Sequence, residues 1–173
     1  QCISELLPPG YDFKHVPRLA GRGGGVGLAY KEPFDVKLMT STADKTYSHF
    51  EHIDCKVSRN NNQPVRLVVV YRPPPSSDNG FKNAVFFEEW RPFLENYVIL
   101  QEDLCIVGDL NFHLNAEEDR DSKIFSSILD GFGLVQHVHE PTHHLGNTLD
   151  VVITRADSEL VSDVSVKDPM LSD

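Results

Sequence analysis

The sequence predicts an α/β fold, a layered sandwich in which sheets are covered by few helices. Strand-like segments outnumber helix-like segments, and the helices are interspersed among the strands along the chain. Residues 65–71 and 104–107 are apolar at nearly every position, as expected of strands that are buried on both faces. Strands of this kind must be covered by other layers, which favours the sandwich architecture.

Length and composition limit the kind of protein. The chain has 173 residues, so we expect residues 1–173 to form a single domain. Its 40% hydrophobic and 24% charged residues are ordinary for a globular protein and exclude collagen, coiled coil and wholesale disorder. The net charge of −10 excludes a basic arm that binds nucleic acid by charge alone. Three well-separated cysteines predict neither a disulfide framework nor a cysteine zinc motif, and they favour a reducing compartment.

The first half of the chain is predicted to be a loop followed by four strands. Residues 1–21 are polar and interrupted by prolines, which indicates a loop. A glycine-rich run at 21–27 then leads into the first strand. The predicted strands are, in order, 28–31, 34–39, 50–57 and 65–71.

The second half is predicted to hold both helices. Apolar residues between Phe86 and Tyr97 recur at helical spacing, which predicts a helix with one buried face. Pro92 lies inside this pattern, so we expect a kink or a new first turn there. A second, shorter amphipathic helix is predicted at 122–129. The remaining predicted strands are 104–107, 134–138, 149–154 and 160–166.

Polar side chains at predicted strand ends are the candidates for chemistry, because ligands of layered α/β proteins gather there. Asp109 and Asn111 follow a buried strand two positions apart, so in extended geometry they point the same way. Asp150 opens a strand, and Asp173 is the last residue of the chain. Mg²⁺ binds carboxylate oxygens together with substrate phosphates, which suits these residues. A simple turn explains the Gly-Asp-Leu-Asn composition equally, and both interpretations stay open.

Three further patterns each have two interpretations. Tyr71 ends a buried strand and either fills the core or presents a phenol that hydrogen-bonds a phosphate oxygen. The glycine run 21–27 lacks the preceding strand and following helix of a phosphate-binding loop, so a tight turn before a strand explains it better. Four histidines could bind zinc, but no cysteine or paired-ligand spacing accompanies them, and a polar strand face is the simpler interpretation. They are His137, His139, His143 and His144.

Five segments, in order along nearly the whole chain, resemble the endonuclease/exonuclease/phosphatase superfamily. The resemblance is greatest to the endonuclease domains of LINE-type (non-LTR) retrotransposons. The segments are Arg-Gly-Gly-Gly-Val at 22–26, Val-Val-Tyr-Arg-Pro-Pro at 69–74, Gly-Asp-Leu-Asn at 108–111, Glu-Pro-Thr-His at 140–143 with Gly-Asn-Thr-Leu-Asp at 146–150, and Ser-Asp at 172–173.

This resemblance implies a four-layered α/β sandwich, with two facing mixed sheets and outer helices, that lacks its first strands and the end of its last motif. It implies hydrolysis of a phosphodiester by in-line attack of water, with Mg²⁺ or Mn²⁺ as cofactor. Asp109 would position or deprotonate the water, Asn111 would hold a phosphate oxygen, and Tyr71 would contact the phosphate. Asp173 would bind metal together with Asp109 and Asn111, and Asp150 would orient the family's terminal histidine.

The resemblance also raises an expectation about the ends of the chain. The family's first-strand asparagine and metal-binding glutamate would precede residue 1, and its terminal histidine would follow Asp173. Groups that act as one unit lose several powers of ten in rate when one member is removed. We therefore expect this chain by itself to be weakly active or inactive.

The expected function is that of a DNA-nicking endonuclease domain in a retrotransposon polyprotein that also carries a reverse transcriptase domain. Two alternatives stay open: a phosphatase of the same superfamily, and a non-catalytic truncated remnant. We expect a monomer with no membrane partner, because no stretch approaches the ~18 apolar residues of a membrane span. Neither a signal peptide nor an Asn-x-Ser/Thr site is present, so we expect an intracellular protein, nuclear or cytoplasmic, that is not secreted.

Overall fold

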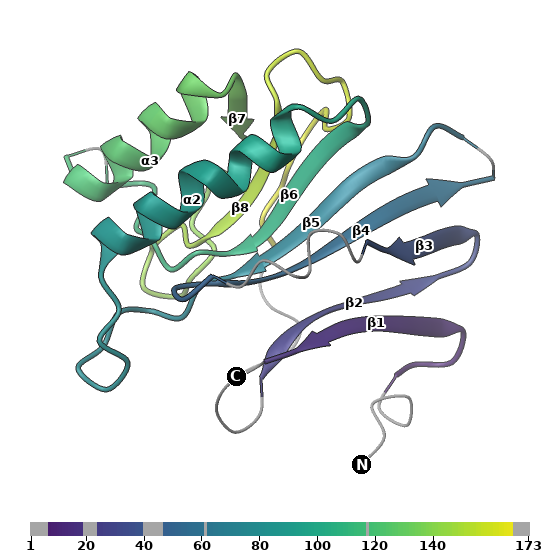
Figure 1. Ribbon diagram of the computed structural model, residues 1–173, viewed down its shortest axis with the longest axis horizontal. Coiled ribbons are helices and arrows are strands. Elements are labelled where there is room, and N and C mark those ends of the chain that lie inside the picture. Colours follow the sequence, from purple (N-terminus) through teal and green to yellow (C-terminus); the bar gives the residue numbers. More distant parts are fainter. Residues whose placement is uncertain (1–6, 19–23, 40–46, 61, 117, 168–173) are drawn as a thin grey trace.

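A computed structural model describes residues 7–18, 24–39, 47–60, 62–116 and 118–167. The described chain forms two sheets and two helices (Figure 1). The elements in chain order are β1 (Tyr11–Pro17), β2 (Gly25–Lys31), β3 (Phe34–Leu38), β4 (Glu51–Arg59), β5 (Val65–Tyr71), α2 (Asn83–Val98), β6 (Asp103–Asp109), α3 (Arg120–Gly131), β7 (Leu134–Gln136) and β8 (Asp150–Arg155).

The larger sheet has six strands in the order β3-β4-β5-β6-β8-β7. Its β5–β6 pair is parallel and the other pairs are antiparallel, so the sheet is mixed. Helix α2 makes the crossover that a parallel pair requires. Strands β1 and β2 form a separate antiparallel sheet.

The two sheets and the helices lie in layers. Figure 1 shows α2 and α3 on one face of the six-stranded sheet and the β1–β2 sheet on the other. The fold is therefore an α/β sandwich of two sheets, as the sequence predicts. Within the described residues, helices cover the six-stranded sheet only, on its outer face.

Strand β5 lies at the centre of this arrangement because both of its faces are apolar. Val68 and Val70 point toward the helices and are almost completely buried. Val69 and Tyr71 point the other way and pack in the smaller core between the sheets. On the helix side the core is largely aromatic and comes mainly from the predicted face of α2. The buried residues of α2 are Phe86, Phe87, Trp90, Phe93, Leu94 and Tyr97.

Two sequence predictions about elements are wrong, and a third is settled in part. Residues 11–17 form strand β1 rather than loop, since this polar segment gains its structure by pairing with β2. Helix α2 continues through Pro92 as a single helix, so of the two outcomes expected at that residue the new first turn is absent. Residues 160–166 form no strand, and Leu160 is 37% exposed, which leaves this segment little apolar surface to bury.

No helix in the described parts of the chain combines the length and the apolar character needed to cross a bilayer.

Candidate active site

Strand register brings four polar side chains into one row across the larger sheet. Glu51 of β4 pairs with Tyr71 of β5, Tyr71 pairs with Asp109 of β6, and Asp109 pairs with Asp150 of β8. Directly paired residues point to the same face of a sheet. Because Tyr71 packs in the core between the two sheets, the row lies on the face that is turned away from the helices.

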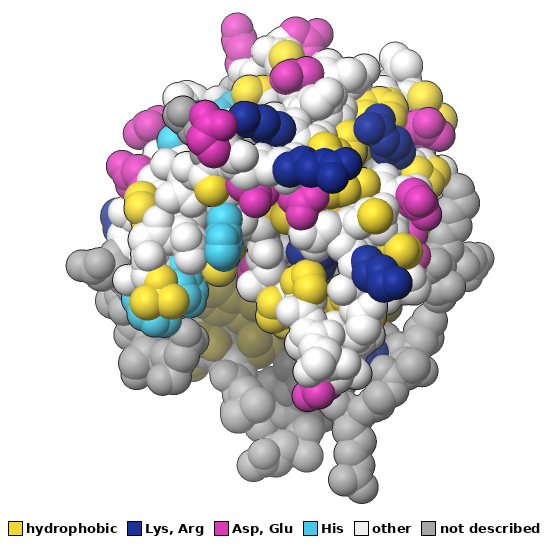
Figure 2. Space-filling view, turned by 90° about the vertical axis from the view of Figure 1, so that its left-hand side faces the viewer, with side chains coloured by type: hydrophobic (Ala, Val, Ile, Leu, Met, Phe, Trp, Pro, Cys, Tyr) yellow, Lys and Arg dark blue, Asp and Glu magenta, His cyan; other side chains and the backbone are white. Residues whose placement is uncertain are grey.

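The row lies at the edge of the sheet where the parallel strands β5 and β6 both end. Figure 2 looks onto this end of the molecule and shows side chains of both charge signs, with histidines gathered toward one side. The ends of parallel strands are the usual place for ligands in α/β proteins. The sequence-predicted residues Tyr71, Asp109 and Asp150 are thus brought together at such a place.

Asn111 is fixed next to Asp109 by a sharp turn. It adopts a positive φ of 52°, and its backbone N–H donates to the Asp109 carboxylate at 2.9 Å. Its side-chain amide donates to the carbonyl of Arg72 at 2.8 Å. The turn interpretation is therefore correct for this segment, and the turn itself holds Asn111 beside the row. The side chain of Asn111 also hydrogen-bonds the Asp109 carboxylate, so backbone and side chain both tie this residue to Asp109.

Asp150 is held in place by a threonine in the loop that precedes it. The hydroxyl of Thr142 accepts hydrogen bonds from the backbone N–H groups of Leu149, at 2.9 Å, and Asp150, at 3.2 Å. Leu110 donates its backbone N–H to the carbonyl of Leu149 at 3.1 Å, which ties this loop to the end of β6. The two aspartates therefore have fixed backbones on neighbouring strands.

Burial raises the pKa of the Asp109 carboxyl above its ordinary value, and the negative charge of Asp150 raises it further. The hydrogen bond from Asn111 and the nearby His143 act in the opposite direction. A cation bound at Asp109 would oppose the effects of burial and of Asp150, because positive charge favours the ionised carboxylate. The side-chain oxygens of Asp109 and Asn111 suit Mg²⁺, which commonly binds one or two carboxylates and completes its shell with water and substrate phosphate. No cluster of three His, Cys, Asp or Glu side chains suited to a metal exists among the residues described.

Sequence reasoning missed two charged residues: Glu51, which is part of the row, and Arg18, which pairs with it. The Arg18 guanidinium is paired with the Glu51 carboxylate, and both side chains are partly exposed. This hydrogen bond and charge raise the pKa of Arg18. Gly24 leaves space for the pair, since a Cβ there would lie 2.7 Å from the guanidinium carbon. Only the register of β4 with β5 reveals Glu51, so no local motif could have indicated it.

The remaining sequence candidates have other positions. Asp173 lies outside the described residues, and so do residues 21–23 of the glycine run. His137 shares a hydrogen bond of 2.8 Å with Thr154, as a residue on a polar strand face does. The rings of His143 and His144 lie 4.1 Å apart at an interplanar angle of 40°, in the loop before β8.

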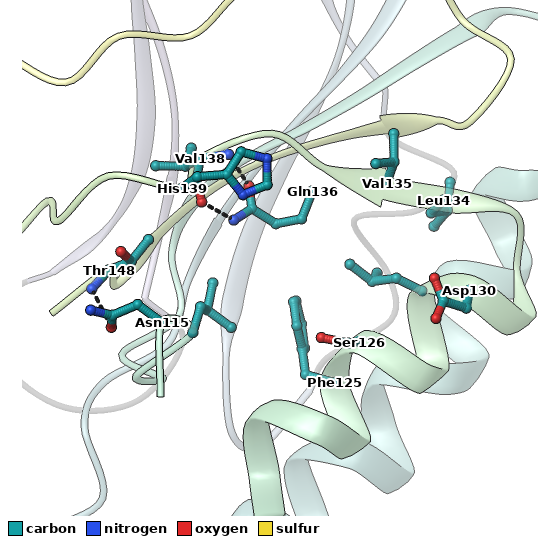
Figure 3. A pocket seen from close by; sticks show the side chains of 12 residues that line it. Asn115, Phe125, Ser126, Asp130, Leu134, Val135, Gln136, Val138, His139 and Thr148 are labelled. Carbon is teal, nitrogen blue, oxygen red and sulfur yellow. Dashed lines mark hydrogen bonds between the residues drawn. The ribbon is translucent and has the colours of Figure 1, made fainter. Parts of the chain in front are cut away.

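Away from the row, a concavity of about 450 Å³ lies between α3, β7 and the loops beside them (Figure 3). Its polar lining groups are bonded internally: Asn115 accepts from the Thr148 N–H at 3.1 Å, and Gln136 donates to the Val138 carbonyl at 2.6 Å. Asp130 is the carboxylate among its 12 lining residues. The converging acids and Tyr71 lie in the row instead, which makes the row the better candidate for chemistry.

Comparison with known proteins agrees with this fold. The sequence profile of the Endonuclease/Exonuclease/phosphatase family matches residues 3–173. The chain therefore belongs to this family, and the resemblance inferred from its sequence motifs is confirmed. No curated protein sequence matches the chain.

Solved structures of low sequence identity share the fold. The endonuclease domain of TRAS1, a telomere-specific non-LTR retrotransposon, superposes with a TM-score of 0.62 at 15% identity, over 86% of this chain and 66% of that one. The human Nocturnin catalytic domain gives 0.52 at 14% identity, over 88% and 62%. The mannosyl-6-phosphatase Bt3783 of Bacteroides thetaiotaomicron gives 0.57 at 11% identity, over 86% and 64%. The chain thus spans slightly less than two thirds of each of these structures.

Proposed function

We propose that this chain is a Mg²⁺-dependent phosphodiester hydrolase, the DNA-nicking endonuclease domain of a retrotransposon polyprotein. Mn²⁺ would serve in place of Mg²⁺, and the same polyprotein would carry a reverse transcriptase domain. The observation that supports the proposal is the row of Tyr71, Asp109 and Asp150 at the ends of β5 and β6 in a member of this family. The likeness of the fold to the TRAS1 domain favours the retrotransposon branch.

Each residue of the site has a role that follows from its chemistry. Asp109, with its raised pKa, would orient the attacking water and accept its proton. Tyr71 would donate its phenolic hydrogen to a phosphate oxygen, and Asn111 would hold another phosphate oxygen. Asp150 would orient the imidazole of the family's terminal histidine, because a carboxylate fixes the tautomer of its imidazole partner.

The residues that would hold the metal are Asp109 and Asn111, together with Asp173 outside the described part of the chain. A bound Mg²⁺ would supply positive charge for the negative charge that develops on the phosphate. The net charge of −10 opposes tight binding of DNA, and a bound Mg²⁺ would partly offset this repulsion locally.

The nuclease is preferred over a phosphatase that acts on inositol or lipid phosphates. Such substrates carry several negative charges and need basic residues around the pocket. This chain is acidic between its motifs, at Glu118, Asp119 and Asp121. A DNA substrate would require action in the nucleus, and we propose that the protein acts as a monomer.

The test is nicking of supercoiled plasmid with Mg²⁺ and, separately, with EDTA. It is run on this chain and on a chain extended by its flanking coding sequence. We expect Mg²⁺-dependent nicking by the extended chain, and Asp109→Ala in that chain should abolish it. The matched control is Asp130→Asn, which changes an acid in the concavity between α3 and β7 and should leave nicking unchanged. If neither protein nicks DNA but a phosphomonoester is hydrolysed, the phosphatase replaces the nuclease.

A further inference from the structure

Arg72 directly follows Tyr71 of the row, and its side chain is completely buried, with 0% exposure. The guanidinium lies between two aromatic rings, 5.0 Å from the centre of Phe86 and 4.2 Å from that of Phe112. Phe86 belongs to α2, and Phe112 lies in the segment that follows β6. A cation at such distances is attracted to the faces of the rings. The side chain therefore points back under the site, into the core, rather than toward solvent.

Arg72 is bonded to each of the three residues that follow Gly108. Its backbone N–H donates to the carbonyl of Asp109 at 2.8 Å, and its Nη1 donates to the carbonyl of Leu110 at 3.0 Å. The side chain of Asn111 donates back to the carbonyl of Arg72 at 2.8 Å. The end of β5 is thus fastened to the turn that carries Asp109 and Asn111.

The other end of the guanidinium is anchored on the helices. Its Nη2 donates to Asn83 in the first turn of α2, and Asn83 donates in turn to the Asp121 carboxylate in α3. Asp121 supplies negative charge to the buried cation through this bridge. One side chain therefore connects both helices to the turn of the candidate site.

Burying this charge is unfavourable, which requires an explanation. Desolvation lowers the pKa of Arg72 to about 10, while Asp121 and Asp109 oppose that shift. The guanidinium stays charged at neutral pH. An apolar residue of similar volume often stabilises a protein as well as a buried ion does, or better. Stability alone is therefore a weak reason for an arginine here, whereas the forked geometry of its hydrogen bonds is a strong one.

We propose that Arg72 is a positioning residue for phosphodiester hydrolysis, which holds the turn at 109–111 in register with Tyr71 through the Leu110 carbonyl. It does not touch the substrate. The inference rests on the proposed function for its catalytic consequence, but its structural consequence for the turn can be measured without any activity.

The test compares Arg72→Met and Arg72→Lys with a matched control, Arg155→Met. Arg155 also donates to backbone carbonyls, at 2.8 Å to Val98 and 2.7 Å to Leu100. It lies at the end of β8 that is opposite Asp150, and therefore away from the candidate site. The two readouts are hydrogen exchange of the Asn111 backbone amide and the separate values of kcat and KM for plasmid nicking. All proteins are measured at a temperature at which circular dichroism shows them folded.

We expect Arg72→Met to speed exchange of the Asn111 amide by about tenfold or more, since the turn loses its anchor. It should lower kcat by ~10²-fold with little change in KM, because a misplacement near 1 Å costs about that much. Arg72→Lys should restore neither value, since lysine lacks the planar fork. Arg155→Met should lower the melting temperature and leave both readouts within about twofold.

The proposal is overturned if Arg72→Met leaves the Asn111 exchange rate unchanged, whatever happens to activity. It is also overturned if Arg155→Met changes that rate equally, which would indicate general destabilisation. If Arg72→Met does not fold, Asn83→Ala decides the question, because it removes the anchor of the guanidinium on the helices. Faster exchange of Asn111 then supports the proposal, and unchanged exchange refutes it. If wild-type protein nicks no DNA, the proposed function fails while the exchange experiment still decides the role of Arg72.

Discussion

Asp109 is more easily protonated in the folded protein than in the unfolded chain, because burial and Asp150 raise its pKa. At pH values between the ordinary pKa and the raised one, the folded state binds more protons, so its stability falls as pH rises through that interval. Asp109→Asn removes the charge and keeps an oxygen that can accept the Asn111 N–H. We expect this variant to be more stable than wild type at pH 7 in EDTA, by on the order of 1 kcal/mol, or ~2–4 °C in Tm.

The pH dependence of this gain distinguishes its cause. Below about pH 3 the carboxyl is neutral in both states, so thermal unfolding should give equal Tm values for the two proteins there. The same variant should nick DNA at least ~10²-fold more slowly. A gain that persisted unchanged at low pH would show that charge burial is not its origin. Asp130→Asn, in the concavity between α3 and β7, serves as the control at both pH values.

Gly108 makes the turn at Asp109 possible, because no other residue fits its position. Its φ is +142°, and a Cβ there would lie 1.8 Å from the carbonyl oxygen of Val70. We expect Gly108→Ala to cost more than ~4 kcal/mol, seen as loss of cooperative unfolding in urea. Gly131→Ala is the matched control, since a Cβ there meets nothing within 4 Å and should change stability by no more than ~1 kcal/mol. Equal effects of the two would contradict the steric argument.

At the scale of elements, helix α2 carries a local defect that its packing tolerates. Pro92 lies inside the helix and has no N–H for the carbonyl of Glu88, while its own side chain is exposed. Pro92→Ala restores the donor and removes no buried surface. We expect the free energy of unfolding in urea to rise by about 1–3 kcal/mol. The exposed neighbour Arg91→Ala should change it by less than ~0.5 kcal/mol. An unchanged Pro92→Ala would mean that the helix is shaped around the proline.

Elements whose pattern is local could be predicted from sequence, and those that depend on distant pairing could not. The aromatic face of α2 and the apolar run of β5 are visible in the chain itself. Strand β1 is polar, and it exists because Gly27 of β2 lets the Phe13 ring lie against it; a Cβ at Gly27 would be 2.3 Å from that ring. Residues 160–166 have strand-like composition but, as described, no pairing partner to order them.

The same distinction applies to the candidate site. Tyr71, Asp109, Asn111 and Asp150 follow recognisable strand ends, so their proximity could be predicted. Glu51 joins them only through the register of β4, a non-local property. Arg72 stands between Tyr71 and a proline, where local sequence suggests an exposed rim residue. Its burial depends on rings contributed by two other segments, which no pattern around residue 72 contains.

At the scale of the whole molecule, the candidate site lies where two layers meet. The row is on the face of the six-stranded sheet that the β1–β2 sheet partly covers, while the opposite face is buried under α2 and α3. The helices therefore contribute by holding the turn at 109–111 from behind, through Arg72. A substrate has to approach from the open edge, where the strands end and where Figure 2 shows charges of both signs.

The net charge of −10 predicts how substrate binding depends on salt. A protein that neutralises 6–10 phosphates loses ~10³–10⁵ in affinity between about 50 and 200 mM salt. An acidic chain makes few such contacts, so we expect KM for plasmid DNA to rise by about tenfold or less over this range at saturating Mg²⁺.

Asp78→Lys, in the exposed loop after Tyr71, should lower KM and steepen the salt dependence by about one phosphate contact. Asp103→Lys makes the same charge change at the far end of β6, roughly 20 Å from Asp109, beyond the screening length of ~10 Å, and should do neither. A steep salt dependence in the wild type, or equal effects of the two lysines, would mean that DNA binds over a broad surface rather than at the strand ends.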